Sequence, residues 1–401
     1  MVRIKPLGAG GGGVERSAAA ASGEGISFST QRAEVTVGDR RFSYPSHVIG
    51  DDMGQEVLFN AFMPPRVKAF LDGVNVNVMA YGQTGSGKTH TMFGPPGIMA
   101  RAAAGEYGDS CCADYGLFPR GLLYIFQAYL DMRSAGGAAV LTASAVELSI
   151  AGNEDMLVRR RAAAARKQAL RMDGAQLGVA IDRASNPPRL YGMTELPLET
   201  AEDLRAVYAA LSTRNTASTN MNDTSSRSHC FVFLTLRVRD KASATVRTSR
   251  FQFVDLAGSE RLQEAHGDAW AAGGEVLNGM VTNYSLMMLS ACARGLNEAR
   301  RKGKMKSFSF RTYLFDLVQL LKESMTGDAS TACFVCLSQA PANLMQSKIA
   351  LDFGEVFAKL SNKPLQTRPQ PFSKLVKQAS GLLREADKVL SLHVFAQPST
   401  S

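Results

Sequence analysis

The sequence predicts an α/β fold with a central β-sheet, and three observations support this prediction. Short β-rich apolar runs, each typical of a buried strand, occur at residues 231–238 ("FVFLTLRV"), 251–256 ("FQFVDL") and 332–338 ("ACFVCLS"). Helical patterns separate them, at residues 201–211 ("AEDLRAVYAAL") and 311–325 ("RTYLFDLVQLLKESM"). A further strand pattern leads directly into a glycine-rich loop, at residues 74–80 ("VNVNVMA"). Strands alternating with helices are typical of an α/β sandwich.

The first elements follow from local composition. Residues 8–25 are rich in glycine and alanine and have almost no bulky apolar side chains, which predicts a disordered insertion. Structure is expected to resume at 42–50 ("FSYPSHVIG"). A helical pattern then covers 53–73 and is broken at Pro64-Pro65, because proline lacks the N–H that a helix interior needs.

Composition limits the class of protein and its partners. With 401 residues and 45% apolar side chains, the chain can bury a sizeable core. The formal net charge of +9 favours an acidic partner: nucleic acid, an anionic membrane, or a protein with an acidic face. No stretch approaches the ~20 apolar residues of a membrane span, and the N-terminus has no apolar signal-peptide run. A cytosolic protein is predicted.

The six cysteines form no pairing framework, which indicates a reducing compartment. Cys333 and Cys336 have C-x-x-C spacing within an apolar strand. We interpret them as core residues, with a redox or zinc role as the alternative.

The loop at 82–89 carries the first functional motif, Gly82-x-x-x-x-Gly87-Lys88-Thr89, which is the phosphate-binding pattern G-x-x-x-x-G-K-[ST]. Glycines let backbone N–H groups turn toward phosphate oxygens with no Cβ in the way. Lys88 would neutralise the outer phosphates, and the Thr89 hydroxyl would ligate Mg²⁺. The alternative is a flexible glycine loop, but the pattern is complete and follows a strand. It predicts a bound nucleoside triphosphate.

Two further segments have the chemistry to sense a terminal phosphate. The first, "NMNDTSSRSH" at 220–229, offers two hydroxyls and a fixed positive charge on Ser225, Ser226 and Arg227. The second, "DLAGSE" at 255–260, ends a strand and provides Asp255, Gly258 and Glu260. A carboxylate at a strand end can hold the Mg²⁺ shell through water, and a glycine N–H can bond the γ-phosphate.

Together the three segments resemble those of the kinesin motor family, in the right order. The resemblance includes "VRIKP" at 2–6, where the family has an R-x-R-P strand against adenine and this chain has Lys5 for the second arginine. It covers about residues 2–362. It implies a P-loop NTPase fold with a central, mixed but mostly parallel sheet flanked by helices. It also implies ATP and Mg²⁺ as ligands and a hydrolytic site.

Residue by residue, the resemblance implies three groups of site residues. Those that bind ATP would be Arg3, Pro6, Gly82, Gln83, Thr84, Gly85, Ser86, Gly87, Lys88, Thr89, His90, Arg214 and Asn222, with adenine against Arg3, Pro6 and His90. Those that hold Mg²⁺ would be Thr89, Ser226 and, through water, Asp255. Those that act in hydrolysis would be Lys88, Ser225, Arg227, Gly258 and Glu260, with an ion pair between Arg227 and Glu260.

The resemblance also implies a filament-binding face. A helix containing 277–302, with Asn283, Ser285 and Leu286 matching the family's N-x-S-L, would carry the nucleotide signal to the acidic face of tubulin. Residues expected to contact microtubules are Arg159, Arg160, Arg161, Arg166, Lys167, Arg300, Arg301, Lys302, Lys304, Lys306 and Arg311. From composition alone, the usual explanation of such basic runs is a solvated surface, and binding of an acidic polymer is the competing one. Leu314 stands where the family has a tubulin-facing lysine.

The expected organisation is a motor domain at 1–362, a neck-linker-like segment at 363–374, a short amphipathic helix at 375–393 and a disordered tail at 394–401. The family's cover strand is missing before Met1, so weak or altered docking of the neck-linker-like segment is expected. The apolar stripe of 375–393 spans barely two heptads. It predicts either a helix packed back on the domain or self-association through the start of a coiled coil.

The sequence thus predicts a microtubule-stimulated ATPase motor located in the cytoplasm on the microtubule cytoskeleton. The alternative is a nucleotide-gated microtubule-binding or end-regulating ATPase without processive motility. An inactive scaffold is disfavoured because Lys88, Asp255 and Glu260 are present. A small GTPase is disfavoured by motif order and by the adenine-side residues. Neither nucleic acid binding nor membrane insertion is expected.

Overall fold

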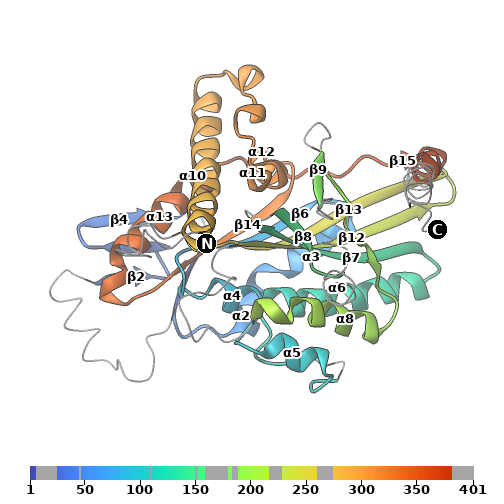
Figure 1. Cartoon of the computed structure of the whole chain (residues 1–401), viewed down its shortest axis with the longest axis horizontal. Helices are drawn as coiled ribbons and strands as arrows, with labels where there is room; N and C mark the ends of the chain where they lie inside the picture. The colour runs from blue at the N-terminus through green and yellow to red at the C-terminus, as the bar shows by residue number, and fades with distance from the viewer. Residues whose placement is uncertain are drawn as a thin grey trace, which may run out of the picture.

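A ten-stranded sheet runs through the middle of the computed structural model (Figure 1). The structure describes residues 1–5, 25–44, 47–108, 110–149, 152–158, 179–182, 188–215, 228–259 and 274–381. The main path of the sheet is, in spatial order, β11 (Leu196–Pro197), β7 (Ala138–Ser149), β12 (His229–Asp240), β13 (Thr245–Asp255), β6 (Val76–Tyr81), β14 (Ser330–Leu337), β1 (Val2–Ile4) and β5 (Val48–Ile49). Four of the seven pairings on this path are parallel, those from β13 across to β5. The predicted class is confirmed: the sheet is mixed, mostly parallel and flanked by helices.

Smaller strands extend this frame. Two join the large sheet off its main path, β8 (Gly152–Asp155) on β7 and β15 (Gln370–Pro371) on β13. A separate three-stranded sheet consists of β2 (Ile26–Ser29), β3 (Glu34–Val37) and β4 (Arg40–Ser43). A two-stranded pair consists of β9 (Ala180–Asp182) and β10 (Arg189–Tyr191).

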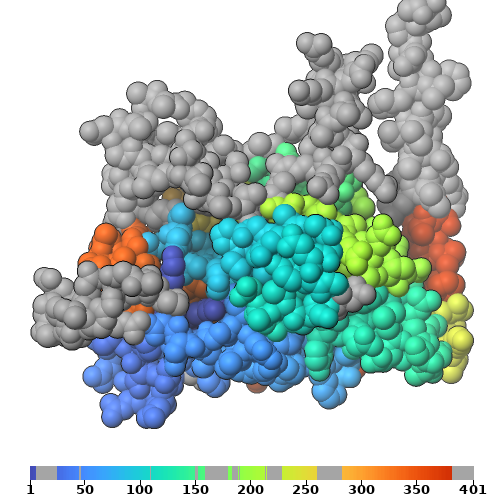
Figure 2. Space-filling view, turned by 90° about the horizontal axis from the view of Figure 1, so that it is seen from below, coloured from blue at the N-terminus to red at the C-terminus, as the bar shows by residue number. Residues whose placement is uncertain are grey.

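Helices cover both faces of the large sheet (Figure 1). One layer contains α2 (Gln55–Phe62), α3 (Pro64–Leu71), α4 (Lys88–Met92), α5 (Ile98–Ala103), α6 (Leu117–Ser134), α8 (Ala201–Leu211) and the 3₁₀ turn η1 (Ser212–Asn215). From below, this layer forms a surface built mostly from the first half of the chain, coloured blue to green (Figure 2). The other layer contains α10 (Gly274–Arg301), η4 (Met305–Ser307), η5 (Phe310–Thr312), α11 (Asp316–Leu320), α12 (Lys322–Thr326), η6 (Pro341–Asn343) and α13 (Leu344–Ala358). Among the described helices, none is long and apolar enough to cross a membrane.

Strand β14 shows why the sheet is covered on both sides. Its side chains alternate between the two faces, as the twofold repeat of a strand requires. Phe334 and Cys336 lie in the core beneath α2 and α6, whereas Val335 and Leu337 lie in the core beneath α10 and α13. A strand that is apolar on both faces can be buried only between two helical layers.

The same alternation decides the role of the C-x-x-C pair. Cys333 and Cys336 are three residues apart in β14, so they contact opposite cores. Burial raises the pKa of both thiols, that of Cys333 to about 12. The prediction of core cysteines is confirmed over a joint redox or zinc role.

The structure agrees with two helix predictions: the break at Pro64-Pro65 and the helix at 201–211. The helical pattern at 53–73 divides into α2 and α3, which meet at Met63 immediately before the two prolines. Helix α8 spans the predicted residues and begins with a capping box: Thr200 accepts a hydrogen bond from the Asp203 backbone, and Asp203 accepts one from the Thr200 backbone.

The prediction of one helix over 311–325 is wrong. The chain forms η5, an extended stretch, and then α11 and α12, which are separated at Leu321. The Gln319 side chain donates to the carbonyls of Phe310 and Tyr313 at 3.1 and 2.8 Å. These bonds satisfy backbone acceptors that a continuous helix would have used, so the amphipathic pattern does not require one.

The neck-linker-like segment lies along the core. Backbone hydrogen bonds join Lys363 to Gly327, Leu365 to Asp328, Thr367 to Gly73 and Phe372 to Ala244. The segment therefore contacts the core repeatedly from the end of α12 to the β12–β13 turn. Arg239 also lies 4.3 Å from the centre of the Phe372 ring.

The remaining domain predictions are only partly covered by the described residues. Residues 372–381 are helical, with Leu375 half-buried and Val376 and Ala379 exposed. The rest of the predicted helix, the predicted tail at 394–401 and residues 8–24 of the predicted insertion lie outside the described residues.

The packing of β14 makes a testable prediction. Phe334 is fully buried and makes an edge contact with Phe62 at 6.0 Å between ring centres. Phe334→Ala is expected to lower the free energy of unfolding by about 3–5 kcal/mol, because a cavity replaces the ring. The control Met345→Ala removes a side chain that is 55% exposed and should cost under about 0.5 kcal/mol. Urea denaturation measures both; equal losses would contradict the two-core packing.

Candidate functional site

The glycine-rich loop joins the end of β6 to α4 in a backbone form that only glycine adopts readily. Gly82, Gly85 and Gly87 have φ angles of 149°, 76° and 97°. A Cβ at Gly82 would lie 2.3 Å from the carbonyl oxygen of Cys336 in the neighbouring strand. The pattern of glycines is therefore required by the loop geometry itself.

The polar groups of the loop gather at its inner side. Lys88, only 7% exposed, donates from Nζ to the Gln83 carbonyl at 2.8 Å. Ser86 Oγ and Gln83 Oε1 are buried and bond to no described residue. Lys5, at the family's second arginine position, donates to the Gly85 carbonyl at 2.8 Å. A buried lysine beside an unsatisfied hydroxyl, which can donate a hydrogen bond, is suited to bind an anion.

Thr89 and Asp255 meet at the carboxyl end of the sheet. The Thr89 hydroxyl donates to Asp255 Oδ2 at 2.8 Å, and Asp255 is 1% exposed. The other carboxylate oxygen, Oδ1, is buried and accepts no hydrogen bond from the described residues. A hydroxyl and a carboxylate with an unsatisfied oxygen are the donors that Mg²⁺ prefers, so these residues fit the predicted metal.

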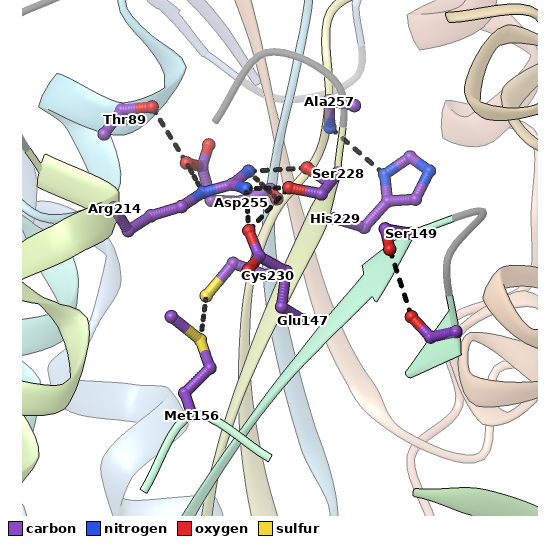
Figure 3. A network of polar contacts seen from close by, with 11 residues as sticks. Thr89, Glu147, Ser149, Met156, Arg214, Ser228, His229, Cys230, Asp255 and Ala257 are labelled. Atoms are coloured by element: carbon purple, nitrogen blue, oxygen red, sulfur yellow. Dashed lines mark hydrogen bonds and ion pairs between the residues drawn. The ribbon is translucent and has the colours of Figure 1, made fainter. Parts of the chain in front are cut away.

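A buried arginine connects this carboxylate to the rest of the sheet (Figure 3). Arg214, 3% exposed in η1, faces Asp255 Oδ2 at 3.5 Å and Glu147 Oε1 at 3.2 Å. It also donates to the hydroxyl and the carbonyl of Ser228, both at 2.6 Å. Burial alone would lower the pKa of Arg214, but the charges of Asp255 and Glu147 raise it. The guanidinium therefore stays charged and links η1, β7, β12 and β13.

Glu147 is a member of this network that the sequence analysis missed. It accepts a 2.6 Å hydrogen bond from the Ser228 hydroxyl as well as the contact from Arg214. One signal could have found it, because Glu147 is the only charged residue in the twelve residues of β7. A carboxylate in a buried strand needs a cationic partner.

Two of the residues predicted to contact adenine, Arg3 and His90, lie close together. Arg3 donates from Nη1 to Gln55 Oε1 at 3.0 Å and to the Thr91 hydroxyl at 2.9 Å. Gln55 donates to the His90 carbonyl at 2.7 Å, and its Nε2 lies 3.0 Å from His90 Nδ1. Burial and then the charge of Arg3 lower the pKa of His90, so its ring is neutral at pH 7. Gln55, the first residue of α2, had no sequence signal.

Comparison with known proteins identifies the family. The family model described as "Kinesin motor domain" matches residues 13–360. The chain belongs to the kinesin motor domain family.

Individual kinesins share this resemblance over most of the chain. The human chromosome-associated kinesin KIF4B is 30% identical over 344 residues, which cover 85% of this chain and 25% of that protein. The rice (Oryza sativa subsp. japonica) kinesin-like protein KIN-4C is 28% identical over 352 residues, 82% of this chain and 25% of that protein. The chain thus spans about a quarter of the length of these relatives.

A solved structure supports the fold. The structure titled "Structure of a fast kinesin: Implications for ATPase mechanism and interactions with microtubules" matches with a TM-score of 0.67 at 23% identity. The match covers 92% of this chain and 93% of that one.

Not all the predicted kinesin site residues lie in the described part of the chain. Those outside it are Pro6, Arg159, Arg160, Arg161, Arg166, Lys167, Asn222, Ser225, Ser226, Arg227 and Glu260. Of the segment at 255–260, called the second switch segment from here on, Asp255 and Gly258 are described and buried. The next residue, Ser259, donates its backbone N–H to the Gly82 carbonyl at 3.2 Å, so this segment lies directly against the phosphate loop.

The basic cluster at the end of α10 is mostly exposed. Its exposed members are Arg301, Lys302, Lys304 and Lys306, and Arg311 is exposed in η5. Lys302 pairs with Glu298 at 2.6 Å. Arg300 differs, because it is half-buried and donates from Nη2 to the Thr326 carbonyl at 2.7 Å, at the end of α12.

His229, the first residue of β12, joins three parts of this kinesin site, and Figure 3 shows its contact with Ala257. Its Nδ1 accepts from the Ala257 N–H at 3.1 Å, and its Nε2 lies 2.9 Å from the Ser285 hydroxyl of α10. Burial, then the charges of Arg214 and Lys88, lower the pKa of His229 to about 3. The ring is therefore neutral, with its proton on Nε2. The histidine ends the quoted "SSRSH" motif, but the sequence analysis gave it no role.

This neutral ring predicts a pH dependence. The folded-state pKa is about 3 and the unfolded value about 6.5, so the unfolded chain binds the extra proton between them. The stability that His229 contributes is complete above about pH 6.5 and is lost as the pH falls toward 3, by about 1.4 kcal/mol per pH unit. Urea denaturation between about pH 7 and 5 measures the slope. His229→Asn should reduce it; an unchanged slope would contradict the neutral ring.

Proposed function

We propose that this chain is a microtubule-stimulated ATPase motor, which hydrolyses ATP to ADP and phosphate and couples the nucleotide state to microtubule binding and movement. The observation that carries this proposal is one continuous arrangement of contacts. Thr89 of the phosphate loop donates to Asp255, and the loop after Asp255 lies against both Gly82 and the histidine that contacts α10. Helix α10 then ends in an exposed basic cluster.

The nucleotide side supports ATP over other anions. The neutral ring of His90 and the adjacent Arg3 suit a flat base, and the loop below them suits its phosphates. We assign Lys88 to neutralising phosphate charge and Gly258 to contacting the terminal phosphate. Outside the described residues, we assign water positioning to Ser225 and the closing ion pair to Arg227 and Glu260.

The metal proposal uses oxygen donors of this chain. Thr89 and Ser226 would hold Mg²⁺ directly and Asp255 through water. When bound, the metal supplies positive charge to the β- and γ-phosphate oxygens. The chain's own contribution is to fix Thr89 and Asp255 relative to each other, which their 2.8 Å hydrogen bond does.

The filament side combines charge with apolar surface. The exposed basic residues at the end of α10 suit an acidic partner. Nearer the start of the same helix, Tyr284 and Met287 are 51% and 64% exposed, and Leu314 after η5 is 58% exposed. Tyr284 packs against Phe315 at 5.3 Å between ring centres, so the two segments form one surface. We propose this surface as the microtubule contact, and the cytoplasmic microtubule cytoskeleton as the location.

The segment after α13 supports movement over regulation without movement. Its backbone hydrogen bonds to Gly327, Gly73 and Ala244 give it a defined path along the core. A segment that can bind and leave such a path is able to change the direction in which the chain continues. Filament gliding on immobilised protein tests this: turnover without gliding would favour the regulatory ATPase.

Removal of one charge tests the ATPase. Lys88→Ala is expected to reduce ATP turnover by about 10²–10³-fold, because the phosphates lose their nearest cation. Turnover with and without microtubules measures the effect. Lys68→Ala, at an exposed position of α3, is the matched control and should leave ATP turnover unchanged. A Lys88→Ala protein with normal turnover would overturn the assignment of this loop.

Neutralisation of the basic cluster tests the filament surface. Lys304→Gln with Lys306→Gln is expected to weaken microtubule co-sedimentation by about three- to tenfold at low salt, because each exposed ion pair contributes up to about 1 kcal/mol. The difference should shrink near physiological salt, where the Debye length is about 8 Å. The control pair is Lys68→Gln with Lys241→Gln, on α3 and in the β12–β13 turn. Equal effects from both pairs would count against the assigned surface.

A further inference from the structure

We propose that His229 and Ser285 form the mechanical link by which the second switch segment sets the position of α10. This inference rests on the proposed function and assigns residues that the predicted site did not contain. Three hydrogen bonds carry it, and together they run from the loop beside the phosphates into the interior of α10.

The direction of each hydrogen bond is fixed by its chemistry. The Ala257 backbone N–H can only donate, so Nδ1 of His229 accepts it at 3.1 Å. The single proton of the neutral ring is then on Nε2 and is donated to Ser285 Oγ at 2.9 Å. Ser285 in turn donates its own proton to the Thr282 carbonyl, one turn earlier in α10, at 2.6 Å. The Ser285 hydroxyl thus accepts one hydrogen bond and donates another.

Burial makes the link sensitive to small displacements. His229 is 4% and Ser285 6% exposed, so water does not readily replace either partner. A buried polar group that loses its partner keeps the full cost of desolvation. If Ala257 moves, the His229 ring must move with it or leave Nδ1 without a hydrogen bond. If the ring moves, Ser285 must likewise move or lose its hydrogen bond from Nε2.

The link begins beside the proposed terminal-phosphate contact and ends beside the proposed filament surface. Ala257 immediately precedes Gly258, which we assign to the terminal phosphate, and the following residue is bonded to Gly82 of the phosphate loop. Ser285 lies between Tyr284 and Met287, which are exposed on the proposed filament surface. The His229 ring and the Ser285 hydroxyl thus connect the segment beside the phosphate loop to the helix that carries the proposed filament surface.

The backbone next to the His229 ring is held in place by the neighbouring residue. The preceding residue, Ser228, is bonded to Arg214 and to Glu147. The His229 backbone is therefore held by β12, while its side chain touches the two segments that are proposed to move. We expect the ring to act by transmitting position, with no proton transfer.

The test compares microtubule dissociation constants of the full chain loaded with an ATP analogue and with ADP. Ser285→Ala removes the hydroxyl that receives the ring proton. His229→Asn places an amide oxygen near the Nδ1 position, which can still accept from Ala257, but does not reach Ser285. Each variant should reduce the ratio of the two constants by about fivefold, the factor expected for one buried neutral hydrogen bond. Ser290→Ala, on the same helix, is the control and should leave the ratio unchanged.

The double variant distinguishes a link from two independent defects. If His229 acts through Ser285, the double variant should lose no more of the ratio than either single variant. Additive losses, or equal weakening of both nucleotide states, would mean a merely structural role and would overturn the inference. So would an unchanged ratio in Ser285→Ala with normal ATP turnover. If the unmodified chain binds filaments equally in both states, the proposed function itself fails, and the inference fails with it.

Discussion

The structure depends on a positive charge buried among two carboxylates. Arg214 is held between Asp255 and Glu147, with Ser228 completing its hydrogen bonds. Removing a guanidinium and two carboxylates from water is costly, and only close mutual contact offsets that cost. The contact can form only if η1, β7, β12 and β13 arrive at the same point. The network therefore fixes how these four elements are arranged at the edge of the sheet beside the loop at 82–89.

The same network both positions the phosphate loop and holds the residue that precedes the histidine in contact with α10. Asp255 both faces Arg214 and accepts the Thr89 hydroxyl, so the phosphate loop is fixed relative to the sheet. Ser228 contacts the same arginine and is followed by the histidine that contacts α10. Rigid strands thus hold the fixed ends of side chains whose free ends touch loops and helix. Under the proposed function, a movement of one loop would displace these side chains, because the strands hold their backbones in place.

The sequence predicted the elements whose causes are local and missed those that depend on distant partners. The glycine spacing around Gly82 follows from backbone angles at consecutive residues, and the break before Pro64 follows from proline itself. Glu147, by contrast, becomes meaningful only beside Arg214, 67 residues away in the chain. The break between α11 and α12 involves Gln319 reaching back to two carbonyls, which an amphipathic pattern does not reveal. Likewise, charge counting placed Arg300 with its exposed neighbours, although its guanidinium binds the end of α12.

The docked segment after α13 has a consequence for how this chain bears load. Besides the four backbone hydrogen bonds between Lys363 and Phe372, β15 of this segment pairs with Thr245 and Val246 of β13. Tension applied from the C-terminal side therefore reaches the bond between Phe372 and Ala244 and the β15–β13 pair before the bonds nearer to α13. The short strand pair would thus have to separate before the rest of the segment could leave the core.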